Sequence, residues 1–250
     1  MIDLQRDAGI AILTLRHAKP LNPFSLEMTR QLVELGPAIE GDDSVKGVLI
    51  WGGEERSFSV GGDFAAIRTL SGRPQYEEYL LDIVRSYQAL LAISKPLVAA
   101  IDHYAMGQGL QVALMADWRV ATERAVCQMP ELANGVPCPL GATILETLLG
   151  RAAMLQLVVG CAKLDAREAL ALRLLDELCP AATLKAAALA RLERLCSHPP
   201  LPYRLTKRLH NARFARALDE IAPEAARIHA TTYVQGAADA HFDRVLGRSP

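Results

Sequence analysis

Residues 105–117 read Ala-Met-Gly-Gln-Gly-Leu-Gln-Val-Ala-Leu-Met-Ala-Asp, and the rest of the chain is organised around them. The apolar run 96–101 comes before this stretch and is typical of a buried strand, whereas residues 110–116 are small and apolar and suit a buried helix. The first N–H groups of a helix have no acceptor within it, and the helix dipole makes that end electropositive. Since Gly107 and Gly109 permit close approach at this helix start, the stretch predicts either tight packing or a site that binds an anionic oxygen.

A second glycine turn occurs earlier, in residues 56–67, which read Arg-Ser-Phe-Ser-Val-Gly-Gly-Asp-Phe-Ala-Ala-Ile. It also follows an apolar strand, at 48–51. Two such strand-to-turn units in one domain can direct two N–H donors at one oxygen. Asp63 could be an acid catalyst or a helix cap, and its place directly after Gly61 and Gly62 favours the cap.

These two turns carry a resemblance to a known family. Residues 57–63 resemble the Phe-x-x-Gly-x-Asp turn of the enoyl-CoA hydratase/isomerase (crotonase) superfamily, and residues 105–111 resemble its Ala-x-Gly-Gly-Gly-x-Glu helix start. The resemblance covers nearly the whole chain. It implies an α/β fold: a crotonase-like spiral of strand-strand-helix repeats over residues 1–197, followed by an all-helical C-terminal oligomerisation segment, 198–250. The family also implies a homotrimer or a hexamer.

Glu131 lies in the irregular and otherwise uncharged stretch 129–143. Taken alone, such a glutamate is typical of a surface loop. It follows Gln108 by 23 residues, however, which is the distance in the family between the second oxyanion donor and the glutamate of the Pro-Glu motif. The resemblance therefore implies that Glu131 is the catalytic base. The family's Leu-Ile-Pro-Gly is replaced by Val-Pro-Cys-Pro at 136–139, so we expect the pocket wall to differ there.

The remaining site residues are also implied by the resemblance. The backbone N–H groups of Gly62 and Gln108 are expected to form an oxyanion hole beside Glu131. The expected substrate contacts are Ser59, Val60, Gly61, Asp63, Gly107, Gln111 and Leu140. Residues 22–25, Asn-Pro-Phe-Ser, occupy the place where the family approaches coenzyme A, and Ser25 is predicted to cap the helix that follows. Lys19 is either a phosphate contact or a solvated loop lysine.

Gln111 sets this chain apart from the hydratase pattern. Family hydratases use two glutamates that share the added water, and the first of them falls on Gln111. Glutamine can orient a water molecule but cannot accept its proton at neutral pH. The sequence therefore favours double-bond isomerisation of an enoyl-CoA, as in fatty acid metabolism, with Glu131 as the single base. Hydration, decarboxylation of a thioester carried by CoA or an acyl carrier protein, and a CoA-binding protein with lost activity remain alternatives. A Clp-type serine peptidase would need a matching histidine motif.

Composition excludes several other classes. The 250 residues carry a net charge of −1, so no basic surplus indicates nucleic-acid binding. No apolar run reaches membrane-spanning length and no signal peptide is evident, which predicts a cytoplasmic protein. The five cysteines lack a Cys-x-x-Cys pair and are expected to be free buried thiols. The histidines lack paired ligand spacing, so we expect no metal, and coenzyme A enters only as part of the substrate.

Apolar periodicity predicts the local structure. Strands are expected at 2–5, 9–15, 46–51, 96–101 and 118–121, with helices from 26 onward, at 75–93 and at 110–116. Residues 71–74 read as a linker. Beyond residue 142 the pattern predicts helices only, at 144–149, 154–159, 166–178, 184–195, 203–210, 214–221 and 223–233, with a boundary at 197–200.

Overall fold

The computed structural model describes residues 1–245 and residue 247, so the end of the predicted segment 198–250 lies outside the described residues. The strands are β1 (Ile2–Asp7), β2 (Ile10–Leu15), β3 (Gly47–Trp51), β4 (Leu97–Ile101), β5 (Tyr104–Met106), β6 (Trp118–Thr122), β7 (Val126–Gln128), β8 (Leu164–Asp165) and β9 (Glu177–Cys179). The α-helices are α1 (Leu26–Glu40), α2 (Phe64–Ile67), α3 (Gly72–Ala92), α4 (Gln108–Ala113), α5 (Pro139–Leu149), α6 (Arg151–Met154), α7 (Ala166–Ala171), α8 (Leu184–Cys196), α9 (Pro200–Val234) and α10 (Asp239–Val245). Shorter turns are the 3₁₀ helices η1 (Leu132–Asn134) and η3 (Ala181–Thr183) and the π-helix η2 (Leu155–Val159).

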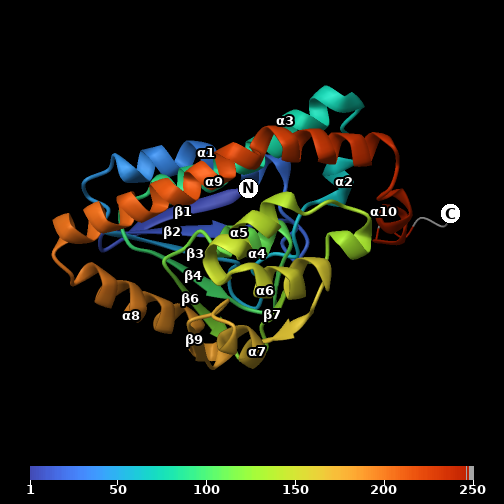
Figure 1. Cartoon of the computed structure of the whole chain (residues 1–250). Helices are drawn as coiled ribbons and strands as arrows, with labels where there is room; N and C mark the ends of the chain where they lie inside the picture. Colours follow the sequence, from blue (N-terminus) through green and yellow to red (C-terminus); the bar gives the residue numbers. More distant parts are fainter. Residues whose placement is uncertain (246, 248–250) are drawn as a thin grey trace.

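A six-stranded sheet forms the centre, in the order β1-β2-β3-β4-β6-β9, and a three-stranded sheet has the order β5-β7-β8 (Figure 1). In the large sheet β1 runs antiparallel to β2, and the other neighbours are parallel. The units β1-β2-α1, β4-β5-α4 and β6-β7-α5 each place two strands before a helix. The strand-strand-helix repeat expected from the resemblance is therefore present.

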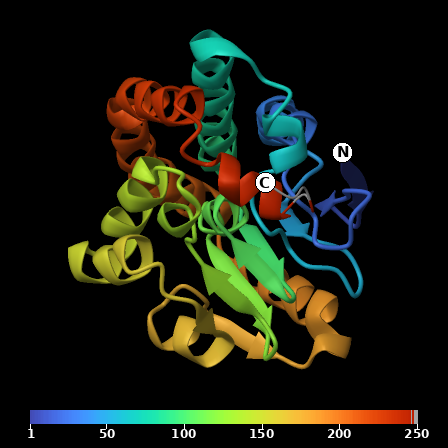
Figure 2. The same ribbon diagram turned by 90° about the vertical axis from the view of Figure 1, so that its right-hand side faces the viewer.

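Helices cover both faces of the large sheet. On one face α8 packs through Leu184, Ala188 and Leu192 against Leu49 and Val98 of the sheet. The other face is covered by the larger core that α1, α3 and α9 share, with α9 running along α3 (Figures 1 and 2). This arrangement brings α9 back over the residues that follow β3 and β4, where its His229 and Tyr233 line the same cavity as Gly62 and Gln108.

Two predicted helix caps are confirmed. The Ser25 hydroxyl accepts a hydrogen bond from the Met28 N–H, 3.1 Å away, at the start of α1. The Asp63 carboxylate accepts one from the Ala65 N–H, also at 3.1 Å, at the start of α2. Both side chains therefore satisfy an N–H group that has no acceptor within its own helix.

The prediction of helices only beyond residue 142 was wrong. The predicted helix 166–178 ends with α7, the chain turns through Arg173 at φ 63°, and β9 then pairs in parallel with β6 at the sheet edge. Strands of two or three residues, such as β8 and β9, are too short to show an alternating pattern.

Two further boundaries also differ. The helices expected at 203–210, 214–221 and 223–233 form one 35-residue helix, α9, with Pro223 inside it. Pro223 removes one backbone hydrogen bond, but packing of the face that carries Phe214, Leu218 and Ala225 holds the helix continuous. The expected linker 71–74 instead begins α3, where Pro74 stands in the first turn and its missing N–H costs no hydrogen bond.

All five cysteines are free, and Cys161 and Cys196 are half-buried rather than buried. Across residues 1–245 and 247, no helix is both long and apolar enough to cross a membrane. The same part of the chain holds no cluster of three or more His, Cys, Asp or Glu side chains with a metal-binding arrangement.

Candidate active site

The two glycine turns lie side by side because their flanking backbones are hydrogen-bonded. The Ser59 N–H donates to the Tyr104 carbonyl at 2.9 Å, and the Met106 N–H donates to the Ser59 carbonyl at 3.0 Å. This forms a parallel bridge between Ser59 and Ala105. A Cβ on Gly109 would come within 2.6 Å of the Ser59 carbonyl oxygen, so the contact requires glycine there.

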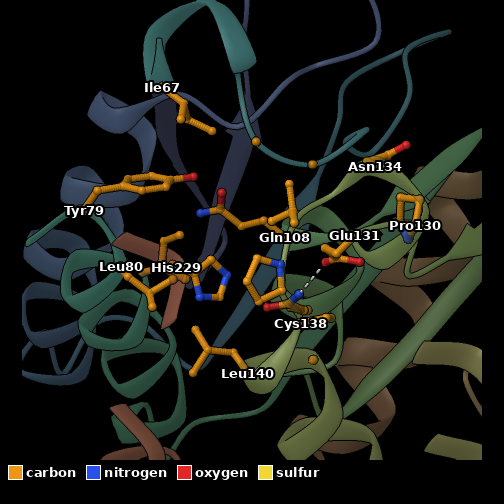
Figure 3. Close-up of a pocket in the computed structure, with 18 of the residues that line it drawn as sticks. Ile67, Tyr79, Leu80, Gln108, Pro130, Glu131, Asn134, Cys138, Leu140 and His229 are labelled. Carbon is orange, nitrogen blue, oxygen red and sulfur yellow. Dashed lines mark hydrogen bonds between the residues drawn. The ribbon is translucent and has the colours of Figure 1, made fainter. Parts of the chain in front are cut away.

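Gly62 and Gln108 carry the N–H groups that this pairing brings together. Both residues line one cavity, shown in Figure 3. Within the described part of the chain, no acceptor is hydrogen-bonded to either N–H group. Gln108 is the first residue of α4, so its N–H has no intrahelical acceptor and lies at the positive end of the helix. The pair is therefore free to stabilise a carbonyl oxygen that gains negative charge.

Gly107 lies between the oxyanion donor and the base. Its backbone has φ 48° and ψ −125°, a conformation that residues with a Cβ avoid. A Cβ at this position would lie 3.1 Å from the Glu131 Oε1 atom. Gly107 therefore allows the carboxylate to approach the start of α4.

Glu131 belongs to a buried chain of side-chain hydrogen bonds. The Tyr87 hydroxyl donates to Gln111 Oε1 at 2.8 Å, and Gln111 Nε2 donates to Glu131 Oε1 at 2.9 Å. The Glu131 Oε2 atom is buried and has no hydrogen-bond partner among the described residues. One carboxylate oxygen is thus held in place, and the other remains available for a proton or a water molecule.

Burial raises the pKa of Glu131 from its usual value to about 7, because the charged form loses its hydration. Hydrogen bonds, including the one from Gln111, favour the carboxylate but offset only part of this effect. A carboxyl group with a pKa near 7 can exchange protons efficiently at neutral pH, as a general base requires.

This pKa predicts a pH-dependent cost in stability. Between about pH 4.5 and 7 the unfolded chain ionises Glu131 while the folded protein keeps it protonated, so stability falls as pH rises through this window. Above pH 7 the penalty is constant, at about 3 kcal/mol. We therefore expect Glu131→Gln to be more stable than the parent at pH 8 by up to about this amount, and nearly equal to it at pH 4.5.

Urea unfolding at both pH values measures the difference. The same exchange at Glu123, whose side chain is exposed, controls for the loss of a carboxylate at the surface. A stability difference between Glu131→Gln and the parent that does not change from pH 4.5 to pH 8 would contradict the assignment.

Several cavity residues were not singled out from the sequence. Tyr79 and Tyr87 line the cavity from α3, and Cys138 lies at the altered wall before α5. His229 reaches the cavity from α9, and its Nδ1 lies 2.9 Å from the Ala225 carbonyl. Burial lowers the pKa of His229 to about 4, so the ring is neutral at pH 7.

Most of the predicted site residues meet around this cavity. Its lining includes the predicted residues Val60, Gly61, Gly62, Gly107, Gln108, Gln111, Glu131 and Leu140. Two others lie outside the lining. Ser59 is fully buried behind the wall, where its hydroxyl accepts the Gly61 N–H at 3.2 Å. Asp63 caps α2, and its Oδ2 lies 3.5 Å from His17 Nε2.

The loop before α1 is tied to the first glycine turn. Asn22 is buried, and its Nδ2 donates to the carbonyls of Gly52 and Ser57 at 2.8 and 2.9 Å. Lys19 is exposed on the same loop. The loop therefore supports the turn that carries Gly62.

Comparison with known proteins gives consistent likenesses. The family model described as enoyl-CoA hydratase/isomerase matches residues 5–240. Carboxymethylproline synthase from Pectobacterium carotovorum subsp. carotovorum is 35% identical over 248 residues, which cover 99% of each chain. Probable enoyl-CoA hydratase EchA17 from Mycobacterium tuberculosis (strain H37Rv) is 35% identical over 199 residues, covering 79% of this chain and 75% of that protein.

Solved structures are also similar. ThnE from S. clavuligerus has a TM-score of 0.79 at 30% identity, over 91% of this chain and 100% of that one. An enoyl-CoA hydratase from Mycobacterium avium subsp. paratuberculosis K-10 has a TM-score of 0.86 at 25% identity, over 96% and 97% of the two chains.

Proposed function

The chain belongs to the enoyl-CoA hydratase/isomerase family and has its crotonase fold, and from this premise we propose that it is a carbon–carbon bond-forming synthase of the carboxymethylproline type. Crotonase-superfamily enzymes act on acyl thioesters. In the proposed reaction, Gly62 and Gln108 hold the thioester enolate through their N–H groups, and Glu131 supplies the base.

The observation that carries this proposal is the Gln111–Glu131 hydrogen bond of 2.9 Å. An amide, that of Gln111, therefore lies beside the carboxylate of Glu131, whereas water addition to an enoyl thioester uses two carboxylates. Gln111 cannot take a proton from water, and Tyr87 fixes its amide from the other side. The site therefore suits an enolate that is generated without a second base.

A carboxymethyl group on a proline ring can be formed from such an enolate. A malonyl-type thioester loses CO₂, and the electron pair of the broken C–C bond becomes the enolate. The enolate carbon then attacks the C=N carbon of a five-membered cyclic imine, whose nitrogen takes a proton. Water activated by Glu131 attacks the thioester carbonyl, and the thiol leaves with a proton. The malonyl-type thioester, the cyclic imine and water together account for the products: CO₂, the thiol and the carboxymethylated amino acid.

The extent of the match with the Pectobacterium synthase also supports the proposal, because that match covers 99% of both chains, whereas the match with the probable hydratase covers 79% of this chain.

Isomerisation of an enoyl-CoA is the second candidate. The raised pKa of Glu131, about 7, favours it, because one carboxylate beside the substrate that both accepts and returns a proton suffices to move a double bond.

A direct assay separates the two reactions. Purified protein is incubated with malonyl-CoA with and without a pyrroline carboxylate, and separately with a 3-enoyl-CoA and with crotonyl-CoA. Mass spectrometry should show free CoA and a carboxymethylproline only when malonyl-CoA and the imine are both present, and slow hydration of crotonyl-CoA. If the 3-enoyl-CoA is converted rapidly and malonyl-CoA is left unchanged, the protein is an isomerase and the proposed synthase activity is wrong.

Gln111→Glu is the informative variant for this assay. It places a second carboxylate beside Glu131, and mutual repulsion raises the pKa of one of them, giving the acid–base pair that hydration uses. We expect hydration of crotonyl-CoA to rise and synthesis to fall relative to the parent.

We also propose a CoA-linked rather than carrier-linked substrate, a cytoplasmic location and a homotrimer or hexamer built by the helical segment after residue 197. Three leucines exposed along one side of α9, Leu201, Leu205 and Leu209, support self-association.

A further inference from the structure

The side chain of Gln108 adds a second feature to the oxyanion site. The Thr29 hydroxyl donates to the Ser25 carbonyl at 3.2 Å, so it can only accept from Gln108, whose Nε2 lies 3.1 Å away. This fixes which end of the amide faces Thr29. Gln108 is 7% exposed, and its Oε1 has no hydrogen-bond partner among the described residues. A buried acceptor without a donor is the kind of group that a ligand satisfies.

Tyr79 places a second polar atom at the same point. Its side chain is also 7% exposed, and no hydrogen bond is formed by its hydroxyl in the part of the chain that the structure describes. A Cβ on Gly62 would lie 3.3 Å from the Tyr79 hydroxyl and 3.8 Å from Gln108 Oε1. Figure 3 shows both side chains reaching toward each other below Ile67.

We propose that Gln108 Oε1 and the Tyr79 hydroxyl form a subsite for a hydroxyl group on the α-carbon of the acyl thioester. The inference deepens the proposed function and rests on it, because the N–H groups of Gly62 and Gln108 must hold the carbonyl oxygen. A substituent on the adjacent carbon then lies beside Gly62, where both polar atoms converge. A hydroxyl can donate to Oε1 and accept from Tyr79, which satisfies both atoms.

The charges around the cavity favour a neutral group over an ammonium. Glu131 is the one carboxylate among the described residues that line the cavity, and it is bonded to Gln111 on the opposite side of the start of α4. Asp63, the acidic residue next to the first turn, is engaged with Ala65 and His17. A cationic substituent would therefore lack a partner at this end of the cavity.

Calorimetry with glycolyl-CoA and acetyl-CoA tests the subsite, since the two thioesters differ only in the α-hydroxyl. We expect the parent to bind glycolyl-CoA about tenfold more tightly. In Gln108→Met, which keeps the length of the side chain but lacks Oε1, the affinity ratio should fall to about one, and Tyr79→Phe should lower it in part. Equal affinities in the parent, or an unchanged ratio in Gln108→Met, would overturn the subsite. Failure of both thioesters to bind would instead overturn the proposed function.

Thr29 provides a matched pair of variants. Thr29→Ser keeps the hydroxyl that orients the amide and should keep the affinity ratio. Thr29→Val preserves the shape but removes the acceptor, so the amide can rotate and the ratio should fall. Thermal unfolding followed by circular dichroism establishes that each variant is folded before binding is compared. A ratio in Thr29→Val equal to that of the parent would show that the hydroxyl does not orient Gln108.

Discussion

Glu131→Gln is expected to lower the turnover of the acyl-thioester substrate by about 10² to 10⁴, the usual contribution of a general base. The amide has the shape of the carboxyl group and can keep the hydrogen bond to Gln111, but it cannot accept a proton. Steady-state kinetics on the substrate identified by mass spectrometry measure the loss, and calorimetry with acetyl-CoA should show binding within a few-fold of the parent.

The pH dependence of the same reaction identifies the group that titrates. With a pKa of about 7, Glu131 is mostly protonated at pH 6, so the parent's kcat/KM should fall about tenfold per pH unit below 7 and level off above it. The residual rate of Glu131→Gln should lack this step. Full activity in Glu131→Gln would mean that decarboxylation, assisted by the oxyanion hole alone, limits the rate, and that the step assisted by Glu131 does not.

The sequence predicted the parts of the site that depend on local backbone geometry. The turns around Gly62 and Gly107 each follow an apolar strand, and both the strand and the glycine are visible as residue types. The caps at Ser25 and Asp63 were predictable for the same reason, because a cap depends on residues within one turn. Glu131 became a candidate only through the family's spacing, since nothing in its own stretch distinguishes it from a surface glutamate.

Features that depend on contacts between distant segments were not predictable in this way. Tyr87 meets Gln111 across 24 residues, and His229 reaches the cavity because α9 folds back along α3. Only the backbone N–H of Gln108 was expected to take part in the site. In the structure its side-chain amide is also held, by a hydrogen bond to Thr29, 79 residues away in the sequence. Periodicity describes one element at a time, so it could not reveal these pairings.

Gly107→Ala is expected to reduce kcat/KM by about a hundredfold or more, the usual effect of losing one oxyanion donor. A side chain at φ 48° and ψ −125° costs about 1–3 kcal/mol, and the backbone can relieve this strain only by shifting the start of α4, which carries the Gln108 N–H. The added Cβ also lies 3.1 Å from Glu131 Oε1 and would displace the base.

Gly53→Ala separates the two effects. Gly53 also has a positive φ, 94°, but it lies outside the cavity lining, and its Cβ would come no closer than 3.4 Å to a neighbouring atom. It should therefore lose stability through backbone strain while its kcat/KM stays near that of the parent. Urea unfolding and steady-state kinetics on both variants provide the comparison. If Gly107→Ala lost no more activity than Gly53→Ala, the start of α4 would not supply the oxyanion donor, because its displacement would leave the reaction unaffected.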